Sequence, residues 1–263
     1  MLYLLSPAKN LDFATPVTPD VAARATQPQF LPRAAELIAV LKKKPASEIA
    51  ALMDLSESLA RLNAERYRAW KKQVTPDNAK PALLAFNGDV YVGLEPYTLT
   101  SADLDWAQSH LAILSGLYGA LRPLDLIQPY RLEMGTRLAT RDAETLYGYW
   151  GDRVARHLNA RLAGEPVPVI VNLASQEYFK VADRRALKAR VVECVFEDWK
   201  TDRYKIVSFF AKRARGLMAR HAIQRRIERP EDLTGFAAAG YAYDLAASEP
   251  DRLVFRRRID SDD

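Results

Sequence analysis

The sequence predicts a mixed α/β fold in which helices surround a central sheet. Strand-like apolar runs alternate with amphipathic segments over most of the 263 residues, and such alternation is typical of helices packed around a sheet. The apolar fraction of 49% is enough for a substantial core. Neither an internal repeat nor a low-complexity linker divides the chain, so we expect a single domain over residues 1–263.

The N-terminal segment predicts a buried strand followed by an irregular excursion. Residues 1–5 form a continuous apolar run, which Pro7 ends because proline cannot continue a central strand. Residues 12–32 contain four prolines and predict an ordered but irregular segment. An amphipathic pattern then predicts a helix over residues 33–43.

Residues 47–70 predict two short helices joined by a tight turn. A helix-hairpin-helix module holds DNA phosphates with backbone N–H groups of its turn and the N-terminus of a helix. Ser56 and Ser58 in the turn are therefore candidate phosphate contacts. The turn sequence LSES lacks the glycine that usually permits close backbone approach, and an ordinary helical hairpin fits the spacing equally well.

The remaining elements follow from the same kinds of pattern. Five apolar or alternating segments predict strands at residues 83–86, 167–173, 191–196, 205–209 and 253–257. Amphipathic segments predict helices over residues 145–162 and 211–227, and residues 235–243 are expected to form a loop.

Positive charge is concentrated in residues 200–229. This segment has ten Lys or Arg and two Asp or Glu, hence a net charge of 10 − 2 = +8, whereas the whole chain has +5. Concentrated positive charge indicates an anionic partner. A solvated helix face is the alternative explanation of the basic helix within this segment.

A second polar cluster falls between residues 122 and 133, inside the segment 114–135, which glycine and proline shape into a loop. Its polar residues are Arg122, Asp125, Gln128, Tyr130, Arg131 and Glu133. A phosphate or base pocket and a buried salt-bridge network explain this cluster equally well. Lys9 is a further candidate, because it follows the first strand at the edge where open α/β sheets bind ligands.

Several classes of function lack support in the sequence. The single cysteine, Cys194, lies in an apolar strand, where a buried and unreactive thiol is expected. The three histidines are widely separated, and no HExxH, P-loop, GxGxxG or GxSxG motif occurs. We therefore expect no metal and no cofactor, and we identify no catalytic set. Without a secretion signal or a membrane-length apolar stretch, the chain is expected to be cytoplasmic and not bound to a membrane.

Five long motifs together resemble one protein family. They are SPAKNLDF, LAFNGDVYVGL, LSGLYGALRPLDLIQPYRLEMG, NLASQEYFK and YKIVSFFAKRARGLMARHAI. In this order, over residues 2–257, they resemble the peroxide stress resistance protein YaaA family, with Asn10 where the family usually has threonine.

The resemblance implies a cytoplasmic protein that limits unincorporated iron, and so Fenton damage, during hydrogen peroxide stress. It also implies a DNA-binding protein with a helix-hairpin-helix element, here residues 47–70, and a positively charged cleft. The cleft would be lined by residues within the matching motifs: Lys9, Arg122, Arg131, Lys180, Lys212 and Arg215.

DNA in such a cleft would be held mainly through backbone phosphates, with weak sequence preference and strong salt dependence. This interpretation needs no catalysis and allows a monomer. The alternative is an enzyme acting on a nucleic acid, a nucleotide or a phosphorylated small molecule in the same cleft. A pocket narrower than a duplex, with Lys9 facing Glu133, would favour the alternative.

Overall fold

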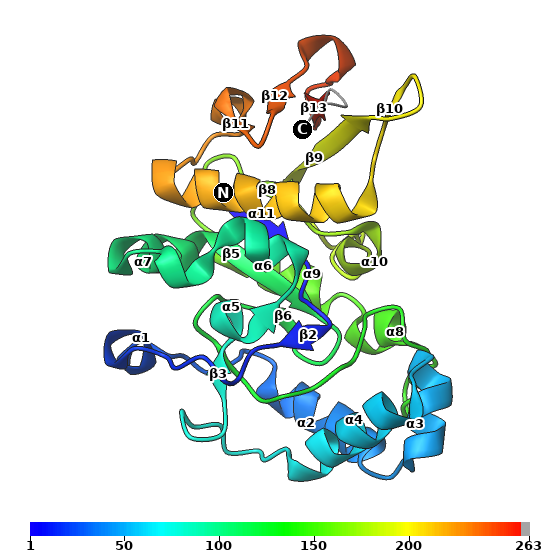
Figure 1. The fold of residues 1–263 in the computed structure, drawn as a ribbon. Helices are drawn as coiled ribbons and strands as arrows, with labels where there is room; N and C mark the ends of the chain where they lie inside the picture. The colour runs from blue at the N-terminus through cyan, green and yellow to red at the C-terminus, as the bar shows by residue number, and fades with distance from the viewer. Residues whose placement is uncertain (259–263) are drawn as a thin grey trace.

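A mixed nine-stranded sheet forms the centre of the computed structural model, which describes residues 1–258 (Figure 1). The order of its strands is β11-β12-β13-β9-β8-β1-β5-β6, and β10 pairs with the outer end of β9. The strands are β1 (Leu2–Leu5), β5 (Leu111–Ser115), β6 (Gly119–Leu121), β8 (Val169–Asn172), β9 (Arg190–Trp199), β10 (Tyr204–Lys205), β11 (Ala237–Ala238), β12 (Tyr241–Tyr243) and β13 (Arg252–Arg257).

The strands at the middle of the sheet are parallel and fully buried. Tyr3 of β1 lies opposite Leu111 of β5 and Val171 of β8, and the pairs β8–β9 and β9–β13 are also parallel. Every residue of β1, β5 and β8 is buried, as expected for parallel strands covered on both faces. Antiparallel pairing appears in the strands toward the two edges of the described sheet and where β10 pairs with the end of β9.

The direction in which the chain adds parallel strands reverses between β1 and β8. The next parallel strand along the chain after β1 is β5, which lies on one side of β1. The later parallel strands β8, β9 and β13 lie in that order on the other side of β1. Such a reversal leaves a crevice at the carboxyl ends of the two central strands, where open α/β sheets bind ligands.

Helices surround this sheet, and three of them form a lobe at the bottom of Figure 1. The lobe contains α2 (Leu31–Leu41), α3 (Ala46–Met53) and α4 (Glu57–Ala69). The other helices are α1 (Pro19–Ala23), α5 (Ala82–Ala85), α6 (Asp89–Leu94), α7 (Ser101–His110), α8 (Leu146–Trp150), α9 (Arg153–Arg161), α10 (Gln176–Phe179) and α11 (Ser208–Arg225). Two short ladders complete the fold, β2 (Asn10–Leu11) with β4 (Phe86–Asn87) and β3 (Lys80–Pro81) with β7 (Leu126–Ile127). None of the described helices is long and apolar enough to cross a membrane.

Helices α6 and α11 pack backbone against backbone. A Cβ atom added to Gly216 would lie 1.8 Å from the Val90 carbonyl oxygen, and one added to Gly93 would lie 2.1 Å from the Arg213 carbonyl oxygen. Only glycine permits this approach. The contact therefore fixes α11 directly against α6.

The predicted fold class, a mixed α/β architecture, is confirmed. The helical pair predicted over residues 47–70 is present as α3 and α4, joined through Asp54 in a left-handed conformation (φ 50°). Ser56 caps α4, and its Oγ accepts a hydrogen bond of 3.4 Å from the Leu59 N–H.

Four local predictions differ from the structure. Residues 82–85 form a helical turn instead of the predicted strand, and Ser208 begins α11 within the segment predicted as a strand at 205–209. Short apolar runs do not distinguish strand from helix by periodicity alone. The helix predicted over 145–162 is split at Gly151, whose φ is 49°. The predicted loop at 235–243 contains the β11–β12 hairpin.

Candidate functional site

A cavity of about 410 Å³ lies at the carboxyl ends of β1 and β8, hereafter the switch-point cavity. Residues 6–10 follow β1, and residues 175–178 follow β8. The lining is made of residues 6–10, residues 87–91, Glu133, Ser175, Glu177, Tyr178, Lys212 and Arg215. The cavity is too small to enclose a DNA duplex but lies within the size range of small-molecule sites.

Hydrogen bonds between neighbouring loops fix the floor of the cavity. The Ser175 N–H donates to Ser6 Oγ at 2.9 Å, which joins the loop after β8 to the loop after β1. The Tyr91 hydroxyl donates to the Ser6 carbonyl oxygen at 3.1 Å. These contacts hold Lys9, Ser175 and the start of α6 around one space.

Glu133 stands between two cations at the rim of this cavity. Lys9 Nζ lies 3.0 Å from Glu133 Oε2, and Arg131 Nη2 lies 3.0 Å from Glu133 Oε1. The Lys9 side chain is 63% exposed, whereas that of Arg131 is only 15% exposed. The Tyr67 hydroxyl of α4 donates to the Arg131 carbonyl oxygen. The helical hairpin is therefore attached directly to the segment that carries Arg131 and Glu133.

Helix α11 supplies Lys212 and Arg215 to the cavity, three residues apart and so on neighbouring turns of one face. Lys212 is exposed and forms no ion pair with another residue of 1–258. Arg215 is half-buried, and its Nε is buried without a hydrogen-bond partner among the described residues. Burial lowers the pKa of the Arg215 guanidinium, and the nearby Glu193 carboxylate opposes that shift.

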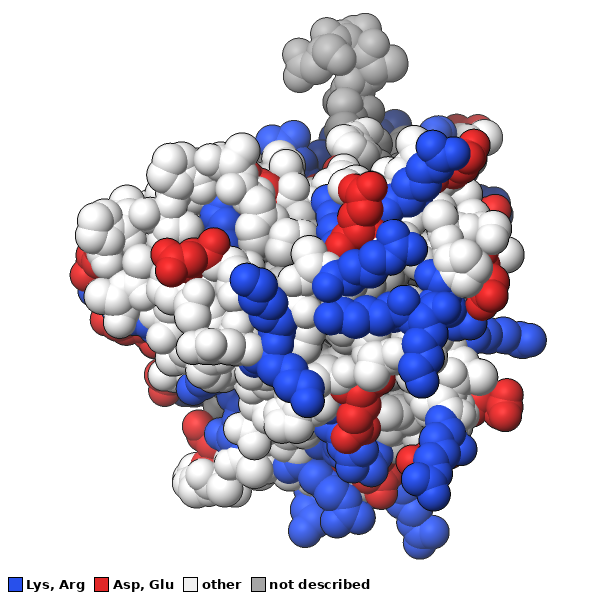
Figure 2. Space-filling model, turned by 90° about the horizontal axis from the view of Figure 1, so that it is seen from below, with Lys and Arg blue, Asp and Glu red and all other residues white. Residues whose placement is uncertain are grey.

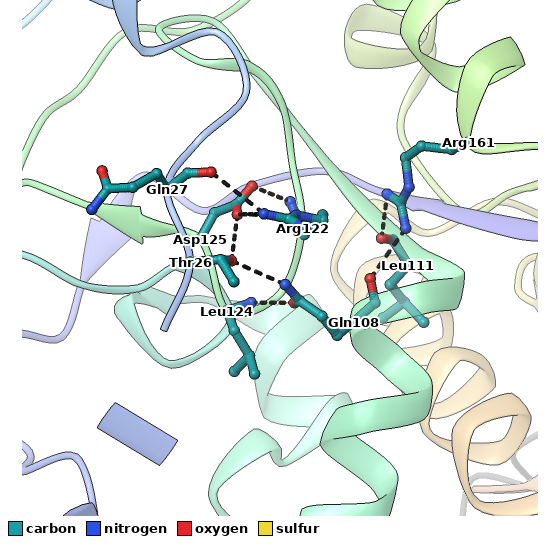
Figure 3. Close-up of polar contacts among 8 residues, drawn as sticks. All are labelled: Thr26, Gln27, Gln108, Leu111, Arg122, Leu124, Asp125 and Arg161. Carbon is teal, nitrogen blue, oxygen red and sulfur yellow. Dashed lines mark hydrogen bonds and ion pairs between the residues drawn. The ribbon is translucent and has the colours of Figure 1, made fainter. Parts of the chain in front are cut away.

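Arg122, which was predicted to line the cleft, lies in a different place, shown in Figure 3. Its backbone N–H, Nε and Nη2 all donate to the Asp125 carboxylate, at 2.8, 3.2 and 3.0 Å. The Thr26 hydroxyl donates to Asp125 at 2.6 Å, and Gln108 connects Thr26 to the Leu124 N–H. These four side chains (Thr26, Gln108, Arg122 and Asp125), hereafter the structural cluster, form no part of the cavity lining.

The carboxylate of Asp125 is the centre of the structural cluster and is only 1% exposed. Burial raises the pKa of Asp125, while the hydrogen bonds from Thr26 and Arg122 act in the opposite direction. Because its cation and its donors all come from within the cluster, this carboxylate is satisfied without any ligand.

Arg131, Lys180, Ser56 and Ser58 also lie outside the cavity lining, although Arg131 pairs with Glu133, which belongs to it. The Lys180 ammonium lies 4.9 Å from the ring centroid of Tyr147, and Lys180 faces a separate depression with Asn172, Gln176 and Glu193. Ser56 and Ser58 are exposed at the N-terminus of α4, with their hydroxyls 3.2 Å apart. Glu57 lies between them, and a carboxylate at a helix N-terminus competes with phosphate for the same positive end.

Several cations of the basic segment 200–229 hold the fold together. Arg220 donates to the carbonyl oxygens of Leu94 and Glu95, at 2.9 and 3.1 Å. Arg226 Nη2 lies 2.9 Å from Asp103 Oδ1. The net charge of this segment is therefore larger than the positive charge available to bind a partner, because Arg220 and Arg226 are engaged within the protein.

Sequence reasoning missed the amide and acidic residues of the cavity, chiefly Asn87, Asp89 and Glu177. Glu177 follows β8 in the same way that Lys9 follows β1, so the rule that indicated Lys9 could also have indicated Glu177. Asn87 ends β4 and Asp89 begins α6, and the position of both depends on the α6–α11 contact, which no local pattern indicates. Among residues 1–258, no three His, Cys, Asp or Glu side chains are grouped as a metal site would require.

Fold and site together define a mixed α/β protein with a polar, ligand-sized cavity at the switch point of its parallel strands. The family model described as "Peroxide stress protein YaaA" matches residues 1–247. The chain belongs to this family, which confirms the resemblance found in its five motifs.

Similar proteins cover almost the whole chain. The chain is 64% identical to a UPF0246 protein of Leptothrix cholodnii over 257 residues, or 98% of each chain. It is 62% identical to a UPF0246 protein of Bordetella pertussis over 258 residues, which are 98% of this chain and 99% of the relative. A UPF0246 protein of Albidiferax ferrireducens is 59% identical over 258 residues, or 98% of each chain.

Proposed function

We propose that this protein binds DNA in the cytoplasm during hydrogen peroxide stress and thereby limits iron-dependent damage. The observation that carries the proposal is a continuous row of cations, hereafter the basic row. It runs from the helical hairpin to the switch-point cavity and consists of Arg66, Arg131, Lys9, Lys212 and Arg215.

The members of the basic row are neighbours through one electrostatic interaction, one shared carboxylate and one shared cavity. Burial lowers the pKa of Arg66 in α4, and the nearby charge of Arg131 adds to this shift. Arg131 and Lys9 share the Glu133 carboxylate, and Lys9 lines the same cavity as the two cations of α11. Around the row, Glu133 is shared by two cations, and Asp89 and Glu177 also line the cavity, so five cations stand against three carboxylates. This excess of positive charge supports an anionic partner along the row.

The lobe beneath the row adds positive charge. Figure 2 shows the face at the bottom of Figure 1, where Lys and Arg side chains gather over one half and Asp and Glu are fewer. Residues 31–72, which contain α2 to α4, have nine Lys or Arg and five Asp or Glu. This excess supports long-range attraction of an anionic chain toward the hairpin.

The chemistry of the row favours contacts with phosphates over contacts with bases. Lys9 faces Glu133 in a cavity too narrow to admit a duplex, which for the cavity itself favours the alternative of an enzyme acting on a nucleotide or a phosphorylated small molecule. Lys and Arg side chains on the surface around it contact backbone phosphates. A duplex would therefore lie across the cavity mouth, with α3 and α4 acting as the helix-hairpin-helix element.

Fluorescence anisotropy with labelled duplex, single-stranded and junction DNA at several salt concentrations tests this proposal. The informative variant is Arg66→Ala/Arg68→Ala, which removes two cations of α4. We expect a roughly tenfold loss of affinity at low salt. The plot of log association constant against log salt concentration should become shallower by about one to two, because fewer phosphates are contacted.

The matched control is Arg185→Ala/Lys188→Ala, which removes the same charge from the loop before β9, at the amino ends of the parallel strands and so opposite the cavity at their carboxyl ends. Its affinity should remain close to that of the unmodified protein. Absence of binding at low salt, or equal losses in the two double variants, would reject the proposal.

A further inference from the structure

The lining of the switch-point cavity differs in charge from the basic row that passes it. Three cations (Lys9, Lys212 and Arg215) and three carboxylates (Asp89, Glu133 and Glu177) face this space. A DNA backbone presents phosphates alone, which three carboxylates would repel. The cavity itself is therefore suited to a ligand with an anionic end and a separate end rich in hydrogen-bond donors.

We propose that the switch-point cavity binds a small phosphorylated molecule of the nucleoside monophosphate class. Its phosphate would form ion pairs with Arg215 and Lys212, and its hydroxyl or amino groups would donate hydrogen bonds to Glu133 and Glu177. This site goes beyond the DNA binding proposed above, because a free nucleotide can occupy it without any DNA.

The position and size of the cavity suit such a ligand. It lies where β1 and β8 end at the reversal of strand order, which is the usual ligand site of an open parallel sheet. Its volume of about 410 Å³ can hold a single nucleotide unit.

The α11 wall provides the phosphate end of the site. The Arg215 guanidinium is half-buried, has no ion pair within residues 1–258, and keeps its Nε unpaired. A buried charge without a partner is costly, and an anion that reaches it removes this cost. Lys212 lies on the next turn and is free to contact the same phosphate.

The opposite wall provides acceptors held in fixed positions. Glu133 is oriented by Lys9 and Arg131, and Glu177 Oε1 accepts a hydrogen bond of 2.9 Å from the Gly135 N–H. Each carboxylate oxygen keeps a further lone pair after these contacts. Sugar hydroxyls or base amino groups are donors of the kind that these oxygens require.

Close backbone contacts fix two sides of the cavity. A Cβ atom added to Gly88 would lie 3.0 Å from the Ala8 Cβ, so the loop before α6 rests directly on the loop after β1. The glycine contact between α6 and α11 fixes the other side. A site formed in advance loses less free energy on ordering when its ligand binds.

Isothermal titration calorimetry with four ribonucleoside monophosphates and four deoxyribonucleoside monophosphates tests the site. The comparison probes are adenosine, ribose 5-phosphate and inorganic phosphate. We expect saturable binding of at least one nucleoside monophosphate, at least tenfold tighter than binding of its nucleoside or of inorganic phosphate. Absence of saturable binding to every phosphorylated probe at millimolar concentration would overturn the proposal.

Two variants test which residues bind the phosphate end and which bind the donor end of the ligand. Arg215→Gln should weaken nucleotide binding at least tenfold, and Glu177→Gln should reduce the preference for the nucleotide over inorganic phosphate. If circular dichroism shows that Arg215→Gln is unfolded, Lys212→Ala at the exposed neighbouring position carries the test, with an expected loss of at least threefold. Unchanged affinity in the folded α11 variants would overturn the assignment.

Failure of this site and failure of DNA binding are distinguishable. Arg66→Ala/Arg68→Ala lies outside the cavity lining and should leave nucleotide affinity unchanged while it weakens DNA binding. An equal loss of nucleotide affinity in this variant would contradict the cavity as the site.

The nucleotide could be free or could be one unit extruded from DNA. Labelled duplexes with and without one unpaired base, titrated with and without the tightest free nucleotide, separate these sources. Competition confined to the unpaired duplex identifies an extruded base, and equal DNA affinity with and without nucleotide identifies the free molecule. Competition of equal size on both duplexes would place the nucleotide on the basic row and would overturn the cavity assignment.

Discussion

The structural cluster and the switch-point cavity both draw on the same twelve-residue segment, yet they use charge in opposite ways. At one end of this segment, Arg122 and Asp125 satisfy each other within the cluster of Figure 3. At its other end, Arg131 and Glu133 reach the rim of a cavity whose far wall has an unpaired Arg215.

This difference shows how to separate a charge that supports the fold from one that awaits a ligand. Asp125 is buried and every partner it needs is internal. Arg215 is also largely shielded, but no carboxylate within residues 1–258 pairs with it. Changes in the cluster should therefore alter stability and leave binding intact, and changes in the cavity should do the reverse.

Asp125→Ala should give the largest loss of stability. It leaves the Thr26 hydroxyl and the Arg122 N–H without their acceptor, and we expect the free energy of unfolding to fall by about 3 to 5 kcal/mol. Urea denaturation measures this change. A loss below about 1 kcal/mol would show that water replaces the carboxylate and that the cluster is not structural.

Acid should lower the free energy of unfolding, because His157 must then be protonated. The His157 ring packs against Phe30, with ring centroids 5.3 Å apart. Burial, and then the charges of Arg161 and Arg122, lower the pKa of His157 from 6.5 to about 4. The unfolded chain therefore binds this proton first as the pH falls, and stability is lost between about pH 6.5 and pH 4.

The expected loss from His157 at pH 5 is about 1 to 2 kcal/mol, allowing for partial exposure of the ring. Denaturation curves at pH 7.5 and pH 5 measure it, with His157→Gln as the comparison. The variant should lose less stability than the unmodified protein over this interval. Identical pH dependence in the two proteins would exclude a buried neutral histidine.

Lys9→Ala should have the smallest effect on stability. Its ion pair with Glu133 is solvent-exposed at the lysine, and such pairs contribute about 0 to 1 kcal/mol. Thermal denaturation should therefore give nearly the same midpoint, while affinity for nucleotide decreases. A large drop in the midpoint would place Lys9 with the structural residues and would remove the contrast between the two regions.

The sequence predicts the fold class and one edge of the site, because both depend on local patterns. Apolar runs and helical periodicity identify β1, β8 and α11, and Lys9 follows from its place after β1. The separation of Arg122 from Arg131 does not follow from sequence. The short strand β7 lies between them and pairs with β3 from a distant part of the chain.

Lys180 shows the same limit on a smaller scale. It follows Ser175 by five residues, and Ser175 lines the cavity, but the turn of helix α10 brings the Lys180 ammonium over the Tyr147 ring instead. Likewise, Arg220 and Arg226 look like free surface charge in sequence and become anchors once α6 and α7 pack beside α11. Tertiary neighbours decide the role of each cation.

The glycine contact between α6 and α11 also limits how the cavity can change. Gly93 and Gly216 each face a backbone carbonyl, so a larger residue at one position cannot be compensated by a smaller one at the other. The spacing of the two helix backbones that carry Asp89 and Lys212 is thus set by contact between main chains. The cavity should accordingly select its ligands by length, and relatives with other ligand sizes should differ in the loops around it instead of at this helix crossing.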